Sequence, residues 1–382
     1  MKFVIAPDSF KGSLTAKQVG LDIQKGLKRI FADADYALVP MADGGEGTVQ
    51  SLVDATHGTF ITKNVVGPLG NSVAAKYGLL GNNTTAVIEM SQASGIQYVN
   101  DQTHNPLITT TFGTGQLIED ALDHNIKKII IGIGGSATND GGAGMAQALG
   151  AQLLDKTGQE LNYGGGQLDK LAKIDLTNLD PRINQTQILI ASDVTNPLTG
   201  PNGASAVFGP QKGATPQMIK TLDSNLHHYA AIIKRDLHKD LEHKDGAGAA
   251  GGLGTGLLAF TNAQMQKGVD IVIEYTHLKQ KAQKADFVFT GEGGIDFQTK
   301  FGKTPYGVAK ACKEVAPHAP VIVLAGNIGK KVSELYGKDT MDAIFATPSG
   351  AKNLQQAIKD SYHDIAETAE NIARLIQSIA NK

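Results

Sequence analysis

Five glycine-rich segments of the sequence carry the acids, lysines and hydroxyls that could do chemistry. The first, 8–13 (Asp-Ser-Phe-Lys-Gly-Ser), lies between a short apolar run and an amphipathic stretch. Backbone N–H groups at the start of a helix favour an anion, and Lys11 adds a full positive charge. Asp8 and Lys11 together suit a substrate carboxylate and hydroxyl, or a phosphate. In the alternative interpretation, Ser13 or Thr15 caps the helix and Lys11 is solvated.

The second segment, 42–48 (Ala-Asp-Gly-Gly-Glu-Gly-Thr), sets two carboxylates ahead of a predicted helix. Asp43 and Glu46 could bind a substrate hydroxyl or Mg²⁺, a hard cation that takes oxygen ligands. A solvated turn with an acidic helix start would explain the same residues equally well.

The third segment, 132–144, combines glycines and hydroxyl side chains between a predicted strand and a predicted helix. Such a loop is typical of a phosphate cradle. It lacks Gly-Lys-Ser/Thr, so it is not a Walker A loop. It does match Gly-x-Gly-x-x-Ala from Gly132, with Asp155 roughly twenty residues further on, and so mimics a dinucleotide fingerprint. A nucleotide-dependent oxidoreductase is therefore an alternative.

The fourth segment runs from Ser192 to Gly213 and places Asp193 and Asn196 after a predicted strand, with Lys212 in a later glycine turn. An Asp and Asn pair can hold a metal or orient a hydroxyl nucleophile. The Asn-Pro and Gly-Pro-Asn-Gly sequences are also ordinary turns.

The fifth segment, 290–304, sets Glu292 and Asp296 after a predicted strand and Lys303 near a helix start. Phosphoryl transfer needs cations against the phosphate oxygens and a carboxylate that positions the attacking hydroxyl. The five segments supply both kinds of group, which favours phosphoryl transfer.

Strand–loop–helix units are expected to position these segments. Between 60 and 90, short β-type runs broken by Gly-Pro and Gly-Asn predict antiparallel strands. The alternation elsewhere predicts an α/β fold with right-handed crossovers and a largely parallel sheet, in which ligands sit beyond the carboxyl ends of the strands. The apolar patterns predict strands at 2–6, 36–40, 127–132, 187–191, 286–290 and 320–325, and helices at 15–31, 115–124, 141–150, from Pro216, and at 353–380.

The length of 382 residues exceeds the size at which one hydrophobic core usually keeps growing, so two domains are expected. We assign 1–63, 102–150 and 280–382 to a Rossmann-like α/β domain with a mainly parallel sheet. A smaller, mixed α/β domain would consist of 64–101 and 151–279. The active site is expected in the cleft between the two domains.

Composition excludes several classes of function. Lys and Arg total 35 against 37 Asp and Glu, so no general attraction to nucleic acid or anionic lipid is expected. The single cysteine, Cys312, excludes an intramolecular disulfide and a thiolate zinc cluster. The apolar run 2–6 is too short for a signal-peptide core, and no stretch approaches the length of a membrane span. We expect a cytoplasmic protein with no nucleic-acid or membrane partner; a homo-oligomer is left open.

Five blocks of the sequence, in order over nearly the whole chain, resemble the bacterial glycerate kinases of type I, the glycerate 2-kinases. The blocks are 7–13, 42–48, 132–142, 192–198 and 290–293. The resemblance implies phosphorylation of D-glycerate with ATP and Mg²⁺, giving 2-phosphoglycerate, on two α/β domains with the site in their cleft. Formation of 3-phosphoglycerate, an oxidoreductase and a non-enzymatic sugar-acid sensor remain alternatives.

We infer roles for individual residues within this family. Lys11 would contact the substrate carboxylate or the transferred phosphate, and Asp193 would position the attacking hydroxyl. Many relatives are expected to carry a basic residue after Glu292-Gly293, where this chain has Gly294, so Lys300 or Lys303 would make that phosphate contact. The remaining candidates are Asp8, Ser9, Ser13, Asp43 and Asn196 for substrate; Gly134, Gly135, Ser136, Thr138, Lys212 and Lys303 for ATP or phosphate; and Glu292 and Asp296 for the metal.

Overall fold

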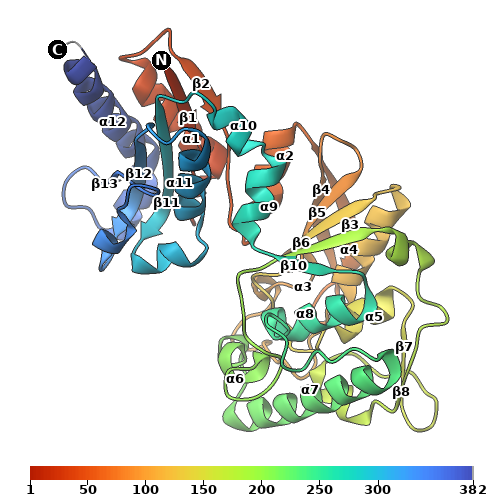
Figure 1. Ribbon diagram of the computed structural model, residues 1–382. Helices are drawn as coiled ribbons and strands as arrows, with labels where there is room; N and C mark the ends of the chain where they lie inside the picture. Colours follow the sequence, from red (N-terminus) through yellow and green to blue (C-terminus); the bar gives the residue numbers. More distant parts are fainter. Residues whose placement is uncertain (381–382) are drawn as a thin grey trace. The chain divides into compact units, whose positions relative to one another are not determined.

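The computed structural model describes residues 1–380, which form two compact units (Figure 1). The first unit contains Met1–Asp43, Gln50–His57 and the chain from Lys267 to the end of the described residues. The second contains Gly44–Val49 and Gly58–Gln266. Helix α2 (Thr48–Thr56) begins in the second unit and continues into the first.

The first unit is built on a five-stranded sheet in the order β13-β12-β11-β1-β2, in which every neighbouring pair is parallel. This is the predicted mainly parallel α/β sheet. Its strands are β1 (Lys2–Ile5), β2 (Asp35–Leu38), β11 (Phe287–Ile295), β12 (Val321–Ile328) and β13 (Ala343–Ala346).

Helices α1 and α12 pack together on one face of this sheet. Phe3 and Ile5 of β1 share a buried apolar cluster with Ile23 of α1 and Ile372 of α12. Thr15 caps α1, and its hydroxyl accepts from the Gln18 N–H, as one interpretation of the sequence expected. The helices of this unit are α1 (Ala16–Lys28), α9 (Gly268–Tyr275), α10 (Leu278–Ala282), α11 (Thr304–Val315) and α12 (Leu354–Ala380), with 3₁₀ turns η5 (Phe297–Phe301) and η6 (Val332–Leu335).

The second unit contains a mixed six-stranded sheet in the order β10-β9-β6-β5-β4-β3. The pairs β3–β4 and β4–β5 are antiparallel, as predicted for residues 60–90, and the remaining pairs are parallel. The strands are β3 (Thr59–Val66), β4 (Ser72–Leu79), β5 (Thr85–Glu89), β6 (Lys128–Gly132), β9 (Gln187–Ala191) and β10 (Gln264–Gln266); β7 (Gln152–Leu154) and β8 (Lys173–Asp175) form a separate antiparallel pair.

Helix α7 confirms the apolar stripe predicted after Pro216. Thr215 caps the helix, Pro216 occupies its first turn, and Leu226 and Tyr229 are fully buried in the core of the second unit. The helices of this unit are α3 (Ser91–Ser94), α4 (Phe112–Asp123), α5 (Ala143–Ala148), α6 (Ala204–Phe208), α7 (Pro216–Leu237) and α8 (Ala249–Phe260), with 3₁₀ turns η1 (Ile96–Tyr98), η2 (Gly165–Lys170), η3 (Pro181–Gln185) and η4 (Pro210–Lys212).

The division of the chain differs from the predicted domain boundaries. Residues 102–150, expected in the first domain, lie in the second unit because β6 pairs with β5 and β9 of the mixed sheet. Residues 267–279, expected in the second domain, lie in the first unit. The unit with the mixed sheet is also the larger of the two, not the smaller. The last two residues of the predicted segment 280–382 lie outside the described residues.

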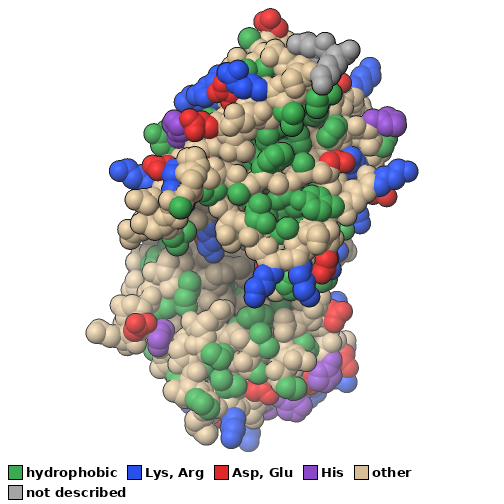
Figure 2. All heavy atoms as spheres, turned by 90° about the vertical axis from the view of Figure 1, so that its left-hand side faces the viewer, with side chains coloured by type: hydrophobic (Ala, Val, Ile, Leu, Met, Phe, Trp, Pro, Cys, Tyr) green, Lys and Arg blue, Asp and Glu red, His purple; other side chains and the backbone are tan. Residues whose placement is uncertain are grey.

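Among residues 1–380, no helix is both long and apolar enough to cross a membrane. On the face shown in Figure 2, basic and acidic side chains are interspersed with hydrophobic ones. This distribution matches the near balance of 35 basic and 37 acidic residues in the sequence.

Candidate active site

Three acids of the first unit lie toward the carboxyl ends of three neighbouring parallel strands. Asp8 follows β1, Asp43 follows β2, and Glu292 lies on the second half of β11, in the sheet order β11-β1-β2. This is the sheet edge at which α/β proteins bind ligands. Together with Lys303 and Thr304, at the start of α11, we call these residues the strand-end cluster.

Asp8 is one of the two buried acids of the strand-end cluster, with Glu292. Its backbone N–H donates to the Gly291 carbonyl at 2.8 Å, which continues the β1–β11 pairing past the end of β1. Its carboxylate accepts from the Ser9 N–H at 2.6 Å and from the hydroxyl of the fully buried Thr304. Burial raises the pKa of Asp8 to about 7, and the nearby charge of Asp43 adds to the rise. Burial therefore favours the protonated form of Asp8 relative to an exposed aspartate.

Glu292 is held by groups from the chain that follows it. Its Oε1 accepts from the Thr299 hydroxyl at 3.0 Å and from Lys303 Nζ at 3.3 Å. Burial raises the pKa of Glu292, while Lys303 opposes that rise. The structure thus brings together a predicted metal ligand, Glu292, and a predicted phosphate contact, Lys303.

Lys303 also contacts the backbone of Gly294, the position at which many relatives are expected to carry a basic residue. Lys303 Nζ donates to the Gly294 carbonyl oxygen at 3.2 Å. The ammonium of Lys300 instead pairs with Glu334. Of the two lysines considered for this place, Lys303 is the one beside Glu292.

Asp296 has a local structural contact. Its Oδ1 accepts from the Gln298 N–H at 2.9 Å and caps the short helix η5. This cap orders the turn that carries Thr299, whose hydroxyl binds Glu292. The predicted metal role of Asp296 stays a prediction.

The loop 8–13 ends in a contact with α12. The Ser13 hydroxyl lies 2.6 Å from the Ser361 hydroxyl and donates to the Ile358 carbonyl oxygen at 3.1 Å. Lys11, between Asp8 and Ser13, is exposed. Ser13, predicted to bind substrate, therefore has a contact that anchors the loop carrying Lys11.

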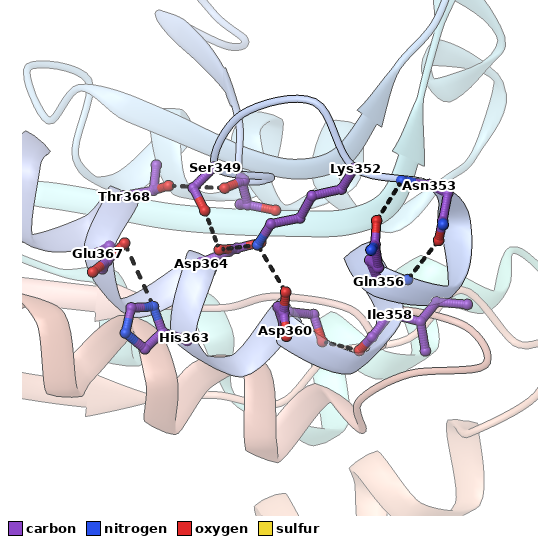
Figure 3. A network of polar contacts seen from close by, with 12 residues as sticks. Ser349, Lys352, Asn353, Gln356, Ile358, Asp360, His363, Asp364, Glu367 and Thr368 are labelled. Atoms are coloured by element: carbon purple, nitrogen blue, oxygen red, sulfur yellow. Dashed lines mark hydrogen bonds and ion pairs between the residues drawn. The ribbon is translucent and has the colours of Figure 1, made fainter.

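The same helix is fixed to the loop before it by a polar network (Figure 3). The carboxylate of Asp364 accepts from Lys352 at 2.8 Å and from the Ser349 hydroxyl at 2.7 Å. In residues 1–380, the one group of three metal-ligating side chains whose ligand atoms lie within 4.8 Å of one another is His363, Asp364 and Glu367. Because Lys352 already neutralises Asp364, this group forms part of an ion-pair network.

In the second unit, Lys212 binds the glycine loop, which we define as residues 132–144. Lys212 is 2% exposed, and its Nζ donates to Ser136 Oγ at 2.7 Å and to the Thr138 carbonyl oxygen at 2.6 Å. Burial lowers the pKa of Lys212 to about 7, against the opposing effect of Asp140. The predicted phosphate-binding residues Ser136, Thr138 and Lys212 are thus in direct contact, and Gly134 and Gly135 form the exposed tip of the loop.

Asp140 fixes the end of the glycine loop from within. This fully buried carboxylate accepts from the N–H and hydroxyl of Thr111, both at 2.8 Å, and from the N–H groups of Gly142 and Gly144. Burial raises the pKa of Asp140, and these donors oppose the rise. Asp140 therefore ties the start of α5 to the residue that precedes α4.

Helix α8 approaches the same loop closely. Gly251 has a left-handed backbone with φ of +67°, and a Cβ at this position would lie 2.0 Å from the Thr138 carbonyl oxygen. Only glycine fits both the conformation and the space. Within the described chain, Thr138 Oγ1, Asn139 Oδ1 and Tyr229 OH are buried without a hydrogen-bond partner, and internal water commonly satisfies such atoms.

Asp193 and Asn196 follow β9 in the same unit. Asp193 is exposed, and Asn196 Nδ2 donates to the Asn202 carbonyl oxygen at 2.8 Å, which closes the turn 196–202. The predicted roles of Asp193 and Asn196 toward a substrate remain predictions.

Asp155 does not occupy the position that a dinucleotide fingerprint requires. It follows β7, which pairs with β8 in a small sheet separate from the six-stranded one, and its carboxylate accepts from the Thr157 N–H and hydroxyl in a tight turn. A ribose-binding acid would follow the next parallel strand of the nucleotide-binding sheet. Asp155 therefore does not serve as the ribose-binding acid that the oxidoreductase alternative requires.

Sequence reasoning missed four residues that shape these sites. Thr299 and Thr304 bind Glu292 and Asp8, and Asp140 and Glu89 fix the loops of the second unit. Thr299, Thr304 and Asp140 stand inside segments that the sequence analysis had singled out, so their position in those segments was the available signal. No local signal marks Glu89, which lies at the end of a hydrophobic strand.

The whole chain resembles proteins of known family. A model of the glycerate kinase family matches residues 3–377. A Bacillus subtilis glycerate kinase is 51% identical over 377 residues, covering 99% of this chain and 98% of its own length. The Escherichia coli glycerate 2-kinase is 49% identical, covering 98% of this chain and 97% of its own length. A crystal structure from Salmonella typhimurium LT2, assigned as glycerate kinase 2, superposes with a TM-score of 0.91 at 49% identity, with 100% of both chains covered. This chain therefore belongs to the glycerate kinase family.

Proposed function

We propose that the protein transfers the γ-phosphoryl group of ATP to D-glycerate and forms 2-phosphoglycerate. The observation that carries this proposal is the match of nearly the entire chain to the glycerate kinase family, together with a relative of 49% identity described as a glycerate 2-kinase. A cytoplasmic location suits this reaction, which consumes ATP.

The strand-end cluster supplies groups that this reaction needs. D-Glycerate brings a carboxylate and two hydroxyls, which call for cations and for hydrogen-bond acceptors respectively. Lys11 is exposed on the loop after Asp8 and is assigned to the carboxylate or the transferred phosphate. Asp8, Ser9 and Asp43 are assigned to the substrate hydroxyls, and Lys303 to a phosphate oxygen. In the second unit, Asp193 is assigned to position the attacking hydroxyl and Asn196 to bind substrate.

The carboxylates of the strand-end cluster fit Mg²⁺. This ion takes oxygen ligands, keeps several waters and is usually held by one or two carboxylates with the substrate phosphates. Glu292 is the foremost candidate because Lys303 and Thr299 hold its side chain in place. Asp296, which lies outside the strand-end cluster and caps η5, is the second candidate. When bound, Mg²⁺ would neutralise charge on the phosphate oxygens.

The glycine loop is assigned to the phosphates of ATP. Gly134 and Gly135 are exposed at its tip, where backbone N–H groups can approach phosphate oxygens without a side chain in the way. Ser136 and Thr138 are buried, and the ammonium of Lys212 donates to the Ser136 hydroxyl and to the Thr138 carbonyl oxygen. We propose that Lys212 maintains the shape of this loop through these hydrogen bonds and contributes positive charge near the phosphates.

A coupled assay of ADP release with D-glycerate and MgATP tests the proposal. Turnover is expected with D-glycerate and is expected to disappear when EDTA removes Mg²⁺. Analysis of the product by ³¹P NMR separates 2-phosphoglycerate from 3-phosphoglycerate. Binding of D-glycerate by folded protein without ATP consumption would contradict the proposal and favour a sensor.

A further inference from the structure

Glu89 is a buried acid that none of the roles above includes. It is the last residue of β5, is 7% exposed, and pairs in register with Gly132, the residue at which the glycine loop begins. The Met90 N–H continues this pairing by donating to the Gly132 carbonyl at 2.9 Å. The backbone of Glu89 is therefore fixed to one end of the glycine loop.

The side chain of Glu89 binds a different segment. Its Oε1 accepts from the Val49 N–H at 3.0 Å, and the N–H groups of Gly47 and Thr48 also donate to its carboxylate. These are the first N–H groups of α2, which have no partner within their own helix. A carboxylate is the favoured group at this position because it opposes the positive end of the helix dipole. Glu89 thus caps α2 from a strand that lies 40 residues away in the sequence.

Close backbone contact joins the two segments. A Cβ at Gly132 would lie 2.8 Å from the Gly44 carbonyl oxygen, so a larger residue would push the segments apart. A Cβ at Gly134 would lie 3.7 Å from Gly45 Cα. The Thr48 hydroxyl closes the intervening turn by donating to the Gly45 carbonyl at 2.8 Å. Residues 44–49 therefore rest on the first part of the glycine loop, and Glu89 holds both.

This arrangement decides how residues 44–49 can take part in a reaction. Their N–H groups at the start of α2 are bonded to Glu89, so they are not offered to an anionic ligand. Any contact of this segment with a ligand must come from side chains or from the backbone ahead of Gly47. The placement of those groups depends on the cap.

We propose that Glu89 is a positioning residue, which fixes residues 44–49 against the glycine loop and thereby sets the loop geometry that phosphoryl transfer needs. The effect of Glu89 on catalysis rests on the proposed function. The effect of Glu89 on the position of residues 44–49 does not. Glu89 is assigned no contact with a reacting atom. It acts through the two loops that it joins.

The test compares Glu89→Ala, Glu89→Gln and a control, Asp120→Ala. Gln keeps one carboxylate-like oxygen where Oε1 accepts from Val49. Asp120 is equally buried in the same unit, and its carboxylate binds Tyr77 and Lys63 rather than a loop of the site. Steady-state kinetics with D-glycerate and MgATP are measured well below each melting temperature. Hydrogen exchange of the peptide covering 44–52 is measured in parallel and needs no activity.

Glu89→Ala is expected to raise exchange at 44–52 and to lower kcat/KM by about tenfold or more, chiefly through kcat. Glu89→Gln is expected to restore most of the wild-type kcat/KM and most of the protection of 44–52 from exchange. Asp120→Ala is expected to stay within about twofold of wild type in kcat/KM. Unchanged exchange at 44–52 in Glu89→Ala would overturn the inference, as would an equal loss of kcat in Asp120→Ala. A wild-type protein without glycerate turnover would instead remove the proposed function, and the exchange data would still test the cap.

Discussion

Lys212 Nζ lies 2.7 Å from Ser136 Oγ, although the two residues are 76 positions apart in the sequence. The lysine is almost fully buried, and its second contact is the Thr138 carbonyl oxygen at 2.6 Å. A buried ammonium is unfavourable unless it is hydrogen-bonded or paired. Its position therefore links the stability of the second unit to the shape of the glycine loop.

Replacement of Lys212 by Met should impair turnover more than folding. Met has a side chain of similar length and carries no charge that must be buried, so folding should be little affected. The Ser136 hydroxyl and the Thr138 carbonyl oxygen, however, lose the hydrogen bonds that Lys212 donates. We expect kcat/KM for ATP to fall about tenfold or more, which corresponds to about 1.4 kcal/mol of lost transition-state stabilisation. Lys239→Met is the matched control, because Lys239 also donates to buried carbonyls, those of Leu258 and Ala259, away from the glycine loop. Equal losses in both variants would contradict the prediction.

The buried state of Lys212 should also make stability depend on pH. Its pKa is about 7 in the folded protein against an ordinary value of 10.5. Between these values the unfolded chain binds a proton that the folded protein does not, so the free energy of unfolding contributed by Lys212 rises with pH. Below about pH 7 both states carry the proton and the difference is constant.

Urea unfolding of wild type and Lys212→Met across this range measures that effect. The free energy of unfolding of wild type, relative to the variant, is expected to rise by about 2 kcal/mol between about pH 7 and pH 9. Parallel pH profiles for the two proteins would show that Lys212 keeps an ordinary pKa.

Local sequence patterns predicted most elements of this fold and the segments of the candidate site. The run 2–6 is a strand because its apolar side chains are buried on both faces of a parallel sheet. Thr15 and Pro216 mark helix starts because capping and a fixed φ act within a few residues. The acids Asp8 and Glu292 could be singled out because each follows a predicted strand, 2–6 and 286–290 respectively.

Long-range pairing could not be predicted in the same way. Residues 102–150, expected with the first sheet, lie in the second unit, and nothing within β6 specifies that it pairs with β5 and β9 instead of β1. The bond between Thr304 and Asp8 spans 296 residues, and the cap of α2 by Glu89 depends on the order of strands in the sheet. Such contacts follow from topology, which one sequence does not reveal.

Lys11→Ala should remove activity without loss of stability. Lys11 is exposed on the loop between β1 and α1, so truncation of its side chain leaves no cavity in the core. We expect kcat/KM for D-glycerate to fall about a hundredfold or more, equivalent to about 2.7 kcal/mol, with an unchanged melting temperature. Lys25→Ala, another exposed lysine in the same region, is the control. Near-normal kcat/KM in Lys11→Ala would remove the role assigned to Lys11.

Thr304→Val should show whether the hydroxyl that binds Asp8 matters for the reaction. Valine keeps the shape of this fully buried side chain but cannot donate to Asp8 Oδ2. Loss of a hydrogen bond to a buried carboxylate is expected to lower the free energy of unfolding by about 1–3 kcal/mol. Because the Asp8 side chain is then less well held, kcat/KM for D-glycerate should also fall about tenfold or more.

Two further variants separate the effect on Asp8 from a general effect of losing a buried hydroxyl. Thr304→Ser retains the donor and is expected to keep kcat/KM within about threefold of wild type. Thr290→Val removes an equally buried hydroxyl of β11, which donates to the Ala6 carbonyl at 2.7 Å and not to a carboxylate. Thr290→Val should therefore lower the melting temperature with little change in kcat/KM. Equal losses of activity in Thr290→Val and Thr304→Val would contradict a specific role for the Thr304 hydroxyl, because of these two threonines it is Thr304 that donates to the carboxylate of Asp8.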